Sequence, residues 1–256
     1  MPPHRPGPGR ETAATGVIYY VSGAQLSRTS MKSISPVEKG NLSSRTYEQI
    51  RDALMNGEYA PGDRLRIAHL AEQLGISITP VREAIFRLVS EQALEMTAAT
   101  SIKVPELEPG TVSEIQLMRR LLEGAAAEHA AQRVTKQEIE ALSATHDAFI
   151  AAVSVSPAQA ASINREFHFK LMAAAQMPSL YNTVAGLWVR MGPLLNVFHS
   201  HLPARAISNR SHPHYRVLAA LKKKDSEAAS RAIQEDIAWG ERVLTEWMAQ
   251  GTRRSA

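Results

Sequence analysis

Four polar side chains lie on otherwise apolar helical faces, and their types and spacing favour metal binding. Asn164 and His168 are four residues apart, so they share one helical face. Further along the chain, His214 and Asp236 each lie at helical spacing from apolar residues, so each belongs to an apolar helical face. A buried polar group is costly unless it has a partner. Imidazole and carboxylate ligands suit zinc, nickel, manganese or iron, so one hypothesis is that these four residues hold one divalent metal.

A second interpretation needs no metal, because His214 and Asp236 can form a hydrogen-bonded pair. Each lies eleven residues from Asp225, an expected helix N-cap. A helical hairpin that turns at Asp225 would bring His214 and Asp236 face to face. Three other histidines are expected at the surface, because most of them fall in a proline-bearing loop: His199, His201 and His212.

Two arginines are candidates for binding a small carboxylate. Arg119 lies on the inner face of a long amphipathic segment, and a guanidinium group can grip a carboxylate through two hydrogen bonds. The alternative for Arg119 is an internal ion pair with Glu123. Arg190 is the second candidate effector-binding residue.

These residues all fall within residues 110–250, where the pattern predicts helices only. Thr135 is an expected N-cap, and Ser156 followed by Pro157 begins another helix. A later helix is expected to kink near Gly192 and Pro193. The predicted fold of this part is an antiparallel bundle of six to seven helices.

Residues 41–106 predict a different, smaller domain. Two amphipathic segments end near Gly57 and at Gly75, and a third helix follows with Thr79 as N-cap and Pro80 in its first position. The stretches "ALEM" and "SIKV" are short strand candidates that form a hairpin. This order predicts a winged helix-turn-helix, so the fold class is mainly α.

The third helix of this domain carries the candidate DNA contacts. In helix-turn-helix proteins the first residues of this helix meet base edges and phosphates in the major groove. Arg82 lies on the face opposite the buried stripe, where it could contact DNA. The alternative is that Arg82 is only a solvent-exposed arginine at the end of a helix. Thr79 and Arg87 are expected to help at phosphates, and two further candidates complete the set: Ser77 and Lys103.

Composition sets outer limits on these interpretations. The 256-residue chain has a net charge of +4 spread along its length, so DNA binding must rest on a local patch. Cysteine is absent, which excludes disulfides, thiolate zinc sites and cysteine nucleophiles. No apolar stretch reaches membrane-spanning length, and a cytoplasmic location is expected. Residues 1–40 are rich in proline and glycine and predict a disordered tail, with Met31 as an alternative start.

Several motifs together resemble the GntR-type bacterial transcription regulators, in the FadR-like subgroup with an all-helical FCD effector-binding domain. The winged part carries "PGDRL", "LAEQLGIS", "TPVREAI" and "EQALE"; the helical part carries "MRRLLEGAAAEHAA", "NREFHFKLMAAA" and "HYRVLAALKKKDSEAASRAI". The resemblance covers roughly residues 43–249. It implies a homodimer that is not an enzyme and that, usually as a repressor, releases a palindromic double-stranded DNA operator when a small carboxylic acid binds. It also implies a divalent metal at Asn164, His168, His214 and Asp236.

The chain departs from the family pattern at several of these positions. Ile78 stands where arginine is common, Ala68 where arginine is often seen, and Thr100 with Ser101 where the wing usually has an Arg-Gly pair. Each lost phosphate contact weakens DNA binding and reduces its salt dependence. One alternative is therefore a metabolite sensor with weakened DNA binding.

The metal positions depart from the pattern as well. Asn164 replaces a common aspartate, and Asp236 replaces a common histidine, so both residues keep atoms that can bind a metal. A further alternative, from a different class, is a metal-dependent hydrolase that uses His168, His214 and Asp236 with a bound water.

Overall fold

The computed structural model describes residues 41–98, 101–201 and 212–254. All of these described residues belong to one compact unit. The expected tail, Met31 and Thr100 lie outside the described residues, as does the side chain of His201.

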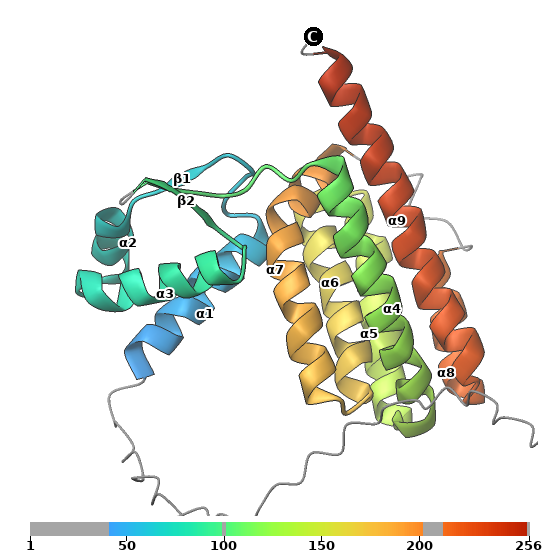
Figure 1. Cartoon of the computed structure of the whole chain (residues 1–256). Helices are drawn as coiled ribbons and strands as arrows, with labels where there is room; N and C mark the ends of the chain where they lie inside the picture. The colour runs from blue at the N-terminus through green and yellow to red at the C-terminus, as the bar shows by residue number, and fades with distance from the viewer. Residues whose placement is uncertain (1–40, 99–100, 202–211, 255–256) are drawn as a thin grey trace, which may run out of the picture. The chain divides into compact units, whose positions relative to one another are not determined.

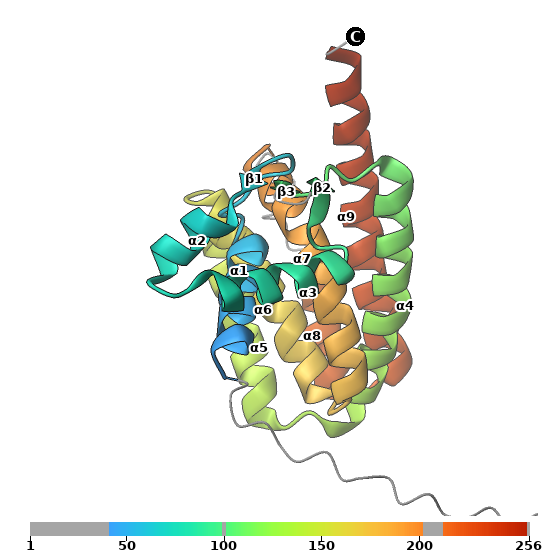
Figure 2. The same cartoon turned by 60° about the vertical axis from the view of Figure 1, so that its left-hand side comes forward.

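The first part of the described chain is a winged helix-turn-helix, as predicted. Val81, Ile85 and Leu88 form the fully buried stripe of its third helix. The three short strands pair antiparallel in the order β1-β3-β2 (Figures 1 and 2; β3 is labelled in Figure 2). The elements are α1 (Asn41–Asn56), β1 (Arg64–Leu65), α2 (Ile67–Leu74), α3 (Ile78–Ser90), β2 (Glu95–Ala98) and β3 (Ser101–Lys103).

The turn between α2 and α3 differs from the prediction in one detail. Gly75 ends α2 in the left-handed region, with φ of 64°, as its position predicts. However, α3 begins at Ile78 with Ser77 as N-cap, so the assignment of Thr79 as N-cap was wrong. Pro80 is tolerated as the third helical residue because the first N–H groups of a helix have no intrahelical partner.

The rest of the chain forms the expected helical bundle, with six helices in the described residues. Figures 1 and 2 both show α9 lying along α4. None of the described helices is long and apolar enough to cross a membrane. The helices are α4 (Pro109–Arg133), α5 (Lys136–Val153), α6 (Pro157–Ala174), α7 (Pro178–His201), α8 (Pro213–Lys223) and α9 (Ser226–Arg254).

Local signals set where these helices begin. Thr135 and Glu138 form a capping box at the start of α5, and the Ser156 hydroxyl accepts from the backbone of Gln159 at the start of α6. The α8–α9 hairpin turns at Lys224 and Asp225, and Asp225 Oδ1 accepts a 3.0 Å hydrogen bond from the backbone N–H of Ala228. The hairpin prediction is therefore confirmed.

Helix α7 runs through Pro193 as one helix, and the kink near Gly192 and Pro193 stays a prediction. Gly192 has a packing role, because a Cβ atom there would lie 2.8 Å from Met55 Cα and 2.9 Å from the Leu54 carbonyl oxygen. Only a glycine lets α1 approach α7 so closely.

Candidate functional site

Three of the four residues predicted to bind a metal meet inside the bundle. His168 from α6, His214 from α8 and Asp236 from α9 are all buried. Asp236 Oδ2 lies 3.2 Å from His168 Nε2 and 3.7 Å from His214 Nε2. Asn164 lines the cavity beside them. The hairpin between α8 and α9 is what brings His214 and Asp236 together.

A buried carboxylate contacts the ring nitrogen of His168 that faces away from Asp236. Glu123 Oε2 lies 2.6 Å from His168 Nδ1, while its other oxygen accepts from Arg119 Nε at 2.8 Å and from Trp188 Nε1 at 3.2 Å. Arg119 also donates to Gln116 Oε1 at 3.0 Å, and its guanidinium lies 3.8 Å from the centre of the Trp188 ring. The internal pair of Arg119 with Glu123, given above as an alternative, is thus present in the structure.

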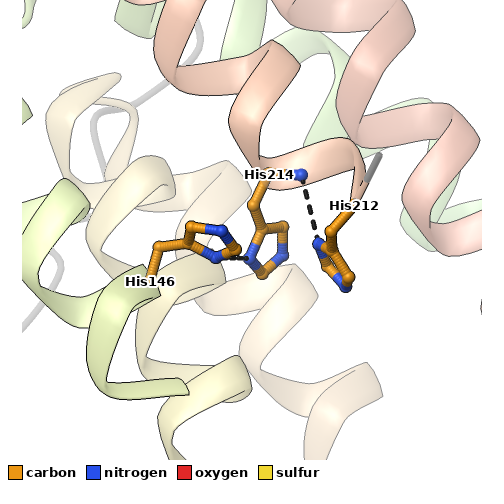
Figure 3. A group of neighbouring side chains, drawn as sticks. All are labelled: His146, His212 and His214. Atoms are coloured by element: carbon orange, nitrogen blue, oxygen red, sulfur yellow. Dashed lines mark hydrogen bonds between the residues drawn. The ribbon is translucent and has the colours of Figure 1, made fainter. Parts of the chain in front are cut away.

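Two further histidines contact the cluster. Figure 3 shows His214 lying between His146, from α5, and His212. His214 Nδ1 is 3.3 Å from His146 Nδ1, and the backbone N–H of His214 donates to His212 Nδ1 at 3.3 Å. His212 is buried, so the expectation that it lies on the surface was wrong: as N-cap of α8 it is drawn inward with the first turn of that helix.

His168 differs from the other imidazoles in charge. Burial alone would lower the pKa of His168, but the carboxylates of Glu123 and Asp236 raise it to about 9. Burial opposes ionisation of Glu123, yet Arg119 and His168 keep its pKa below the usual value. The cationic Arg119 and His168 therefore balance the two buried carboxylates.

The other three imidazoles of the cluster are neutral. Burial lowers the pKa of His146 to about 4 and that of His212 to about 3, and it lowers the pKa of His214 as well. A neutral imidazole has one N–H donor and one acceptor nitrogen. If His214 Nδ1 donates to His146, the lone pair of His214 Nε2 faces His168 and Asp236.

This arrangement fits a divalent metal. His214 Nε2 is buried and has no hydrogen-bond partner among the described residues, as expected for a nitrogen kept for a ligand. Two imidazole nitrogens and one carboxylate oxygen form a common donor set, with a position left for water or substrate. Metal-binding histidines usually donate their other N–H to a carboxylate, which is the relation of His168 to Glu123.

The cluster opens into a small cavity of about 50 Å³. Arg119 and His199 line it, so His199 belongs to the site instead of the surface loop where it was expected. Arg190 lies on α7 but does not line this cavity. The residues that surround the cluster in this cavity are Gln116, Phe149, Asn164, Trp188, Leu195, Phe198, Ile237, Trp239 and Gly240.

The candidate DNA contacts separate into two groups. Ser77, Thr79 and Arg82 are exposed at the start of α3, and the Ser77 hydroxyl does not cap the helix. Arg87 instead lies over the Tyr47 ring at 3.6 Å and pairs with Glu91 at 3.1 Å. Lys103 pairs with Glu106 at 2.6 Å. Among the described residues Arg82 has no ion-pair partner, whereas Arg87 and Lys103 are held by neighbouring side chains.

Comparison with known proteins agrees with both parts of the fold. Residues 42–104 match the bacterial regulatory proteins of the gntR family, and residues 114–238 match the FCD domain. The solved structure of E. coli McbR/YncC has a TM-score of 0.75 and 32% identity, covering 81% of this chain and 98% of that one. A GntR regulator from Rhodococcus sp. RHA1 has a TM-score of 0.64 at 19% identity and covers 79% of this chain and 96% of its own, which supports the fold alone.

Curated relatives are transcription regulators. The HTH-type transcriptional regulator McbR of Escherichia coli K12 is 34% identical over 196 residues, covering 76% of this chain and 89% of that protein. The Nta operon transcriptional regulator of Aminobacter aminovorans is 32% identical over 67% of this chain and 80% of its own length. These relatives do not favour a hydrolase. The chain belongs to the GntR family of bacterial transcription regulators, in the group that carries an FCD domain.

Proposed function

We propose that the protein is a homodimeric repressor that leaves a palindromic operator when a small carboxylic acid binds inside the α4–α9 bundle. The observation that carries this proposal is the cavity that joins Arg119 to the buried cluster of His168, His214 and Asp236. A two-fold symmetric dimer presents its recognition helices to half-sites one helical turn apart. Displacement of either helix from its half-site therefore releases the DNA.

The proposal includes one divalent metal ion, which is zinc, nickel, manganese or iron. His168, His214 and Asp236 would hold it, with Asn164 at the edge of the same cavity. Such an ion supplies a positive centre for a carboxylate ligand in a site that excludes most water. Glu123 orients His168 toward the site, and His146 orients His214 in the same way.

Arg119 is proposed as the second anchor for the acid. A guanidinium group has five N–H donors, and the bonds to Glu123 and Gln116 use two of them. The remaining donors can serve a ligand in the cavity that Arg119 lines. A cavity of about 50 Å³ is far below the several hundred cubic ångströms of drug-sized pockets, which favours a small acid.

A route from this cavity to the DNA-binding domain runs through α6. Asn164 and His168 line the cavity, while Arg165 between them donates to the Met55 carbonyl at 2.5 Å and to Asn56 Oδ1 at 2.6 Å. Met55 and Asn56 end α1. A ligand that shifts α6 therefore also shifts the groups that hold the end of α1.

The first experiment is fluorescence anisotropy of the purified protein on DNA from its own upstream intergenic region. A scrambled duplex serves as control, across a salt series and then with a panel of small mono- and dicarboxylic acids. We expect tight, sequence-dependent binding that one class of acid releases. Weak binding with a shallow salt slope, equal for both duplexes, would instead indicate a sensor with weakened DNA affinity.

Replacing Arg165 by alanine is expected to uncouple the two domains. The variant should bind the operator within about threefold of the native protein. The ratio of DNA affinities without and with the releasing acid, typically about 5- to 150-fold in allosteric proteins, should fall toward one. The exposed Arg231, which within the described residues pairs with Glu227 on its own helix, gives the matched control R231A. A full response to the acid in R165A would contradict the route.

Metal binding is expected to release about one proton at pH 7. In the metal-free protein His168 is protonated, because its pKa is about 9, and it must lose that proton to bind a cation. Affinity should therefore rise about tenfold per pH unit between pH 6.5 and pH 8.5. Titration calorimetry with zinc or nickel in buffers of different ionisation enthalpy measures the proton count. A pH-independent affinity would contradict the loss of a proton from His168 on metal binding.

A further inference from the structure

The recognition helix presents an exposed apolar residue beside Arg82. Ile78, the first residue of α3, is 45% exposed although the opposite face of the same helix buries Val81 and Ile85 completely. Arg82 follows four residues later, and Phe86, which is 50% exposed, four residues after that. This spacing places Ile78, Arg82 and Phe86 along one outward face of α3. Within the described residues Ile78 is not part of the hydrophobic core or of the apolar side chains that pack against it, so core packing does not explain its type.

The position of Ile78 points to the DNA. The first residues of a recognition helix lie nearest the base edges in the major groove. Four helical residues rise about 6 Å, and successive base pairs are about 3.4 Å apart. Ile78 therefore falls within about two base pairs of the base that Arg82 contacts.

The chemistry of isoleucine restricts what it can contact there. Its side chain has neither donor nor acceptor, so it cannot bond to phosphates or to the polar edges of the bases. The one apolar group that a base pair presents in the major groove is the 5-methyl group of thymine. We propose that Ile78 packs against the 5-methyl group of a thymine in each half-site and thereby determines the preference for thymine at that position.

The size of the effect follows from the area of one methyl group. Burial of one methyl against an apolar side chain changes affinity about fourfold. A dimer on two half-sites doubles the free-energy change, so loss of both methyls should weaken binding about 15-fold. Thr79 also has a methyl group, and Phe86 also exposes apolar surface, so both must be tested against Ile78.

The test uses duplexes selected from a randomised library by the full-length protein. In the selected duplex each thymine is replaced in turn by deoxyuridine, which removes only the 5-methyl group, and affinity is measured by anisotropy at fixed salt. We expect one thymine per half-site at which this change costs about fourfold. I78A should bind the thymine duplex correspondingly more weakly and show no difference between thymine and uracil there. I78R should select guanine at that position instead, because arginine pairs with guanine N7 and O6.

Matched variants make the assignment specific. F86A, which removes the other exposed apolar side chain of the face, should keep the full difference between thymine and uracil. T79S should keep it too. A difference that survives in I78A, or that disappears in T79S, overturns the proposal, as does a selected duplex in which no thymine responds. Failure to select any sequence would overturn sequence-specific DNA binding itself, so the two failures are distinguishable. Thermal unfolding of each variant checks that the domain is folded.

Discussion

Replacement of Arg82 by alanine is expected to weaken operator binding at least about 30-fold at physiological salt. Arg82 is exposed at the start of α3, and no carboxylate within the described residues forms an ion pair with it. One bidentate contact between an arginine and a base is worth about 1–3 kcal/mol. In a dimer the loss occurs at both half-sites, which gives the 30-fold lower limit. Anisotropy on the operator measures the effect, and sedimentation confirms that the oligomer is unchanged.

Arg87 provides the matched control, because it is the same residue type on the same helix. Its guanidinium is held over Tyr47 and paired with Glu91, so R87A should change operator affinity less than about threefold. The salt series separates the roles further: loss of a phosphate contact reduces the salt slope by about one, whereas loss of a base contact relaxes sequence preference. Operator affinity retained in R82A would refute the assignment of Arg82 as a base contact.

Local patterns in the sequence were sufficient for most of the architecture. The positions of Gly75, Thr135 and Ser156 set helix ends through backbone conformation and capping, which depend on near neighbours only. The proximity of His214 and Asp236 was also predictable, because a hairpin that turns midway between two residues brings them to the same level of the two helices. The start of α3 differs from the prediction by two positions, because both Ser77 and Thr79 are good N-caps and no local pattern favours one over the other.

The sequence does not predict the residues that surround the three candidate metal ligands: Glu123, His146 and His212. Glu123 was considered only as a partner of Arg119, and its contact with His168 depends on how α4 packs against α6. His146 was overlooked although it lies between Leu142 and Phe149 at helical spacing, the same signal that identified His214. The sequence predicts His212 at the surface, because the polar stretch before it continues through it without a break. Of these three positions, the contact of Glu123 with His168 is the one that only packing between helices far apart in sequence decides.

Replacement of Glu123 by glutamine is expected to be the most destabilising single change in the bundle. Glu123 is 1% exposed and compensates both Arg119 and His168. Arginine does not lose its proton in proteins, so the variant keeps a buried cation without its partner. Breaking a buried ion pair from one side costs about 3–5 kcal/mol. For a domain of this size each kcal/mol lowers Tm by about 2–4 °C, so a decrease of about 6–20 °C is expected in metal-free protein at pH 7.

The pH dependence of this decrease tests its cause. The raised pKa of His168 means that its pairing with Glu123 stabilises the fold fully below about pH 6.5 and is lost as pH rises through about 9. The difference in Tm between native protein and E123Q should therefore shrink from pH 7 to pH 10, while the part that comes from Arg119 persists.

The control variant is E128Q, which makes the identical charge change at an exposed residue of the same helix and should shift Tm by less than about 2 °C. Zinc or nickel affinity should also fall about 10- to 100-fold in E123Q, because His168 loses the carboxylate that orients it. An unchanged Tm would mean that Glu123 does not anchor the cluster.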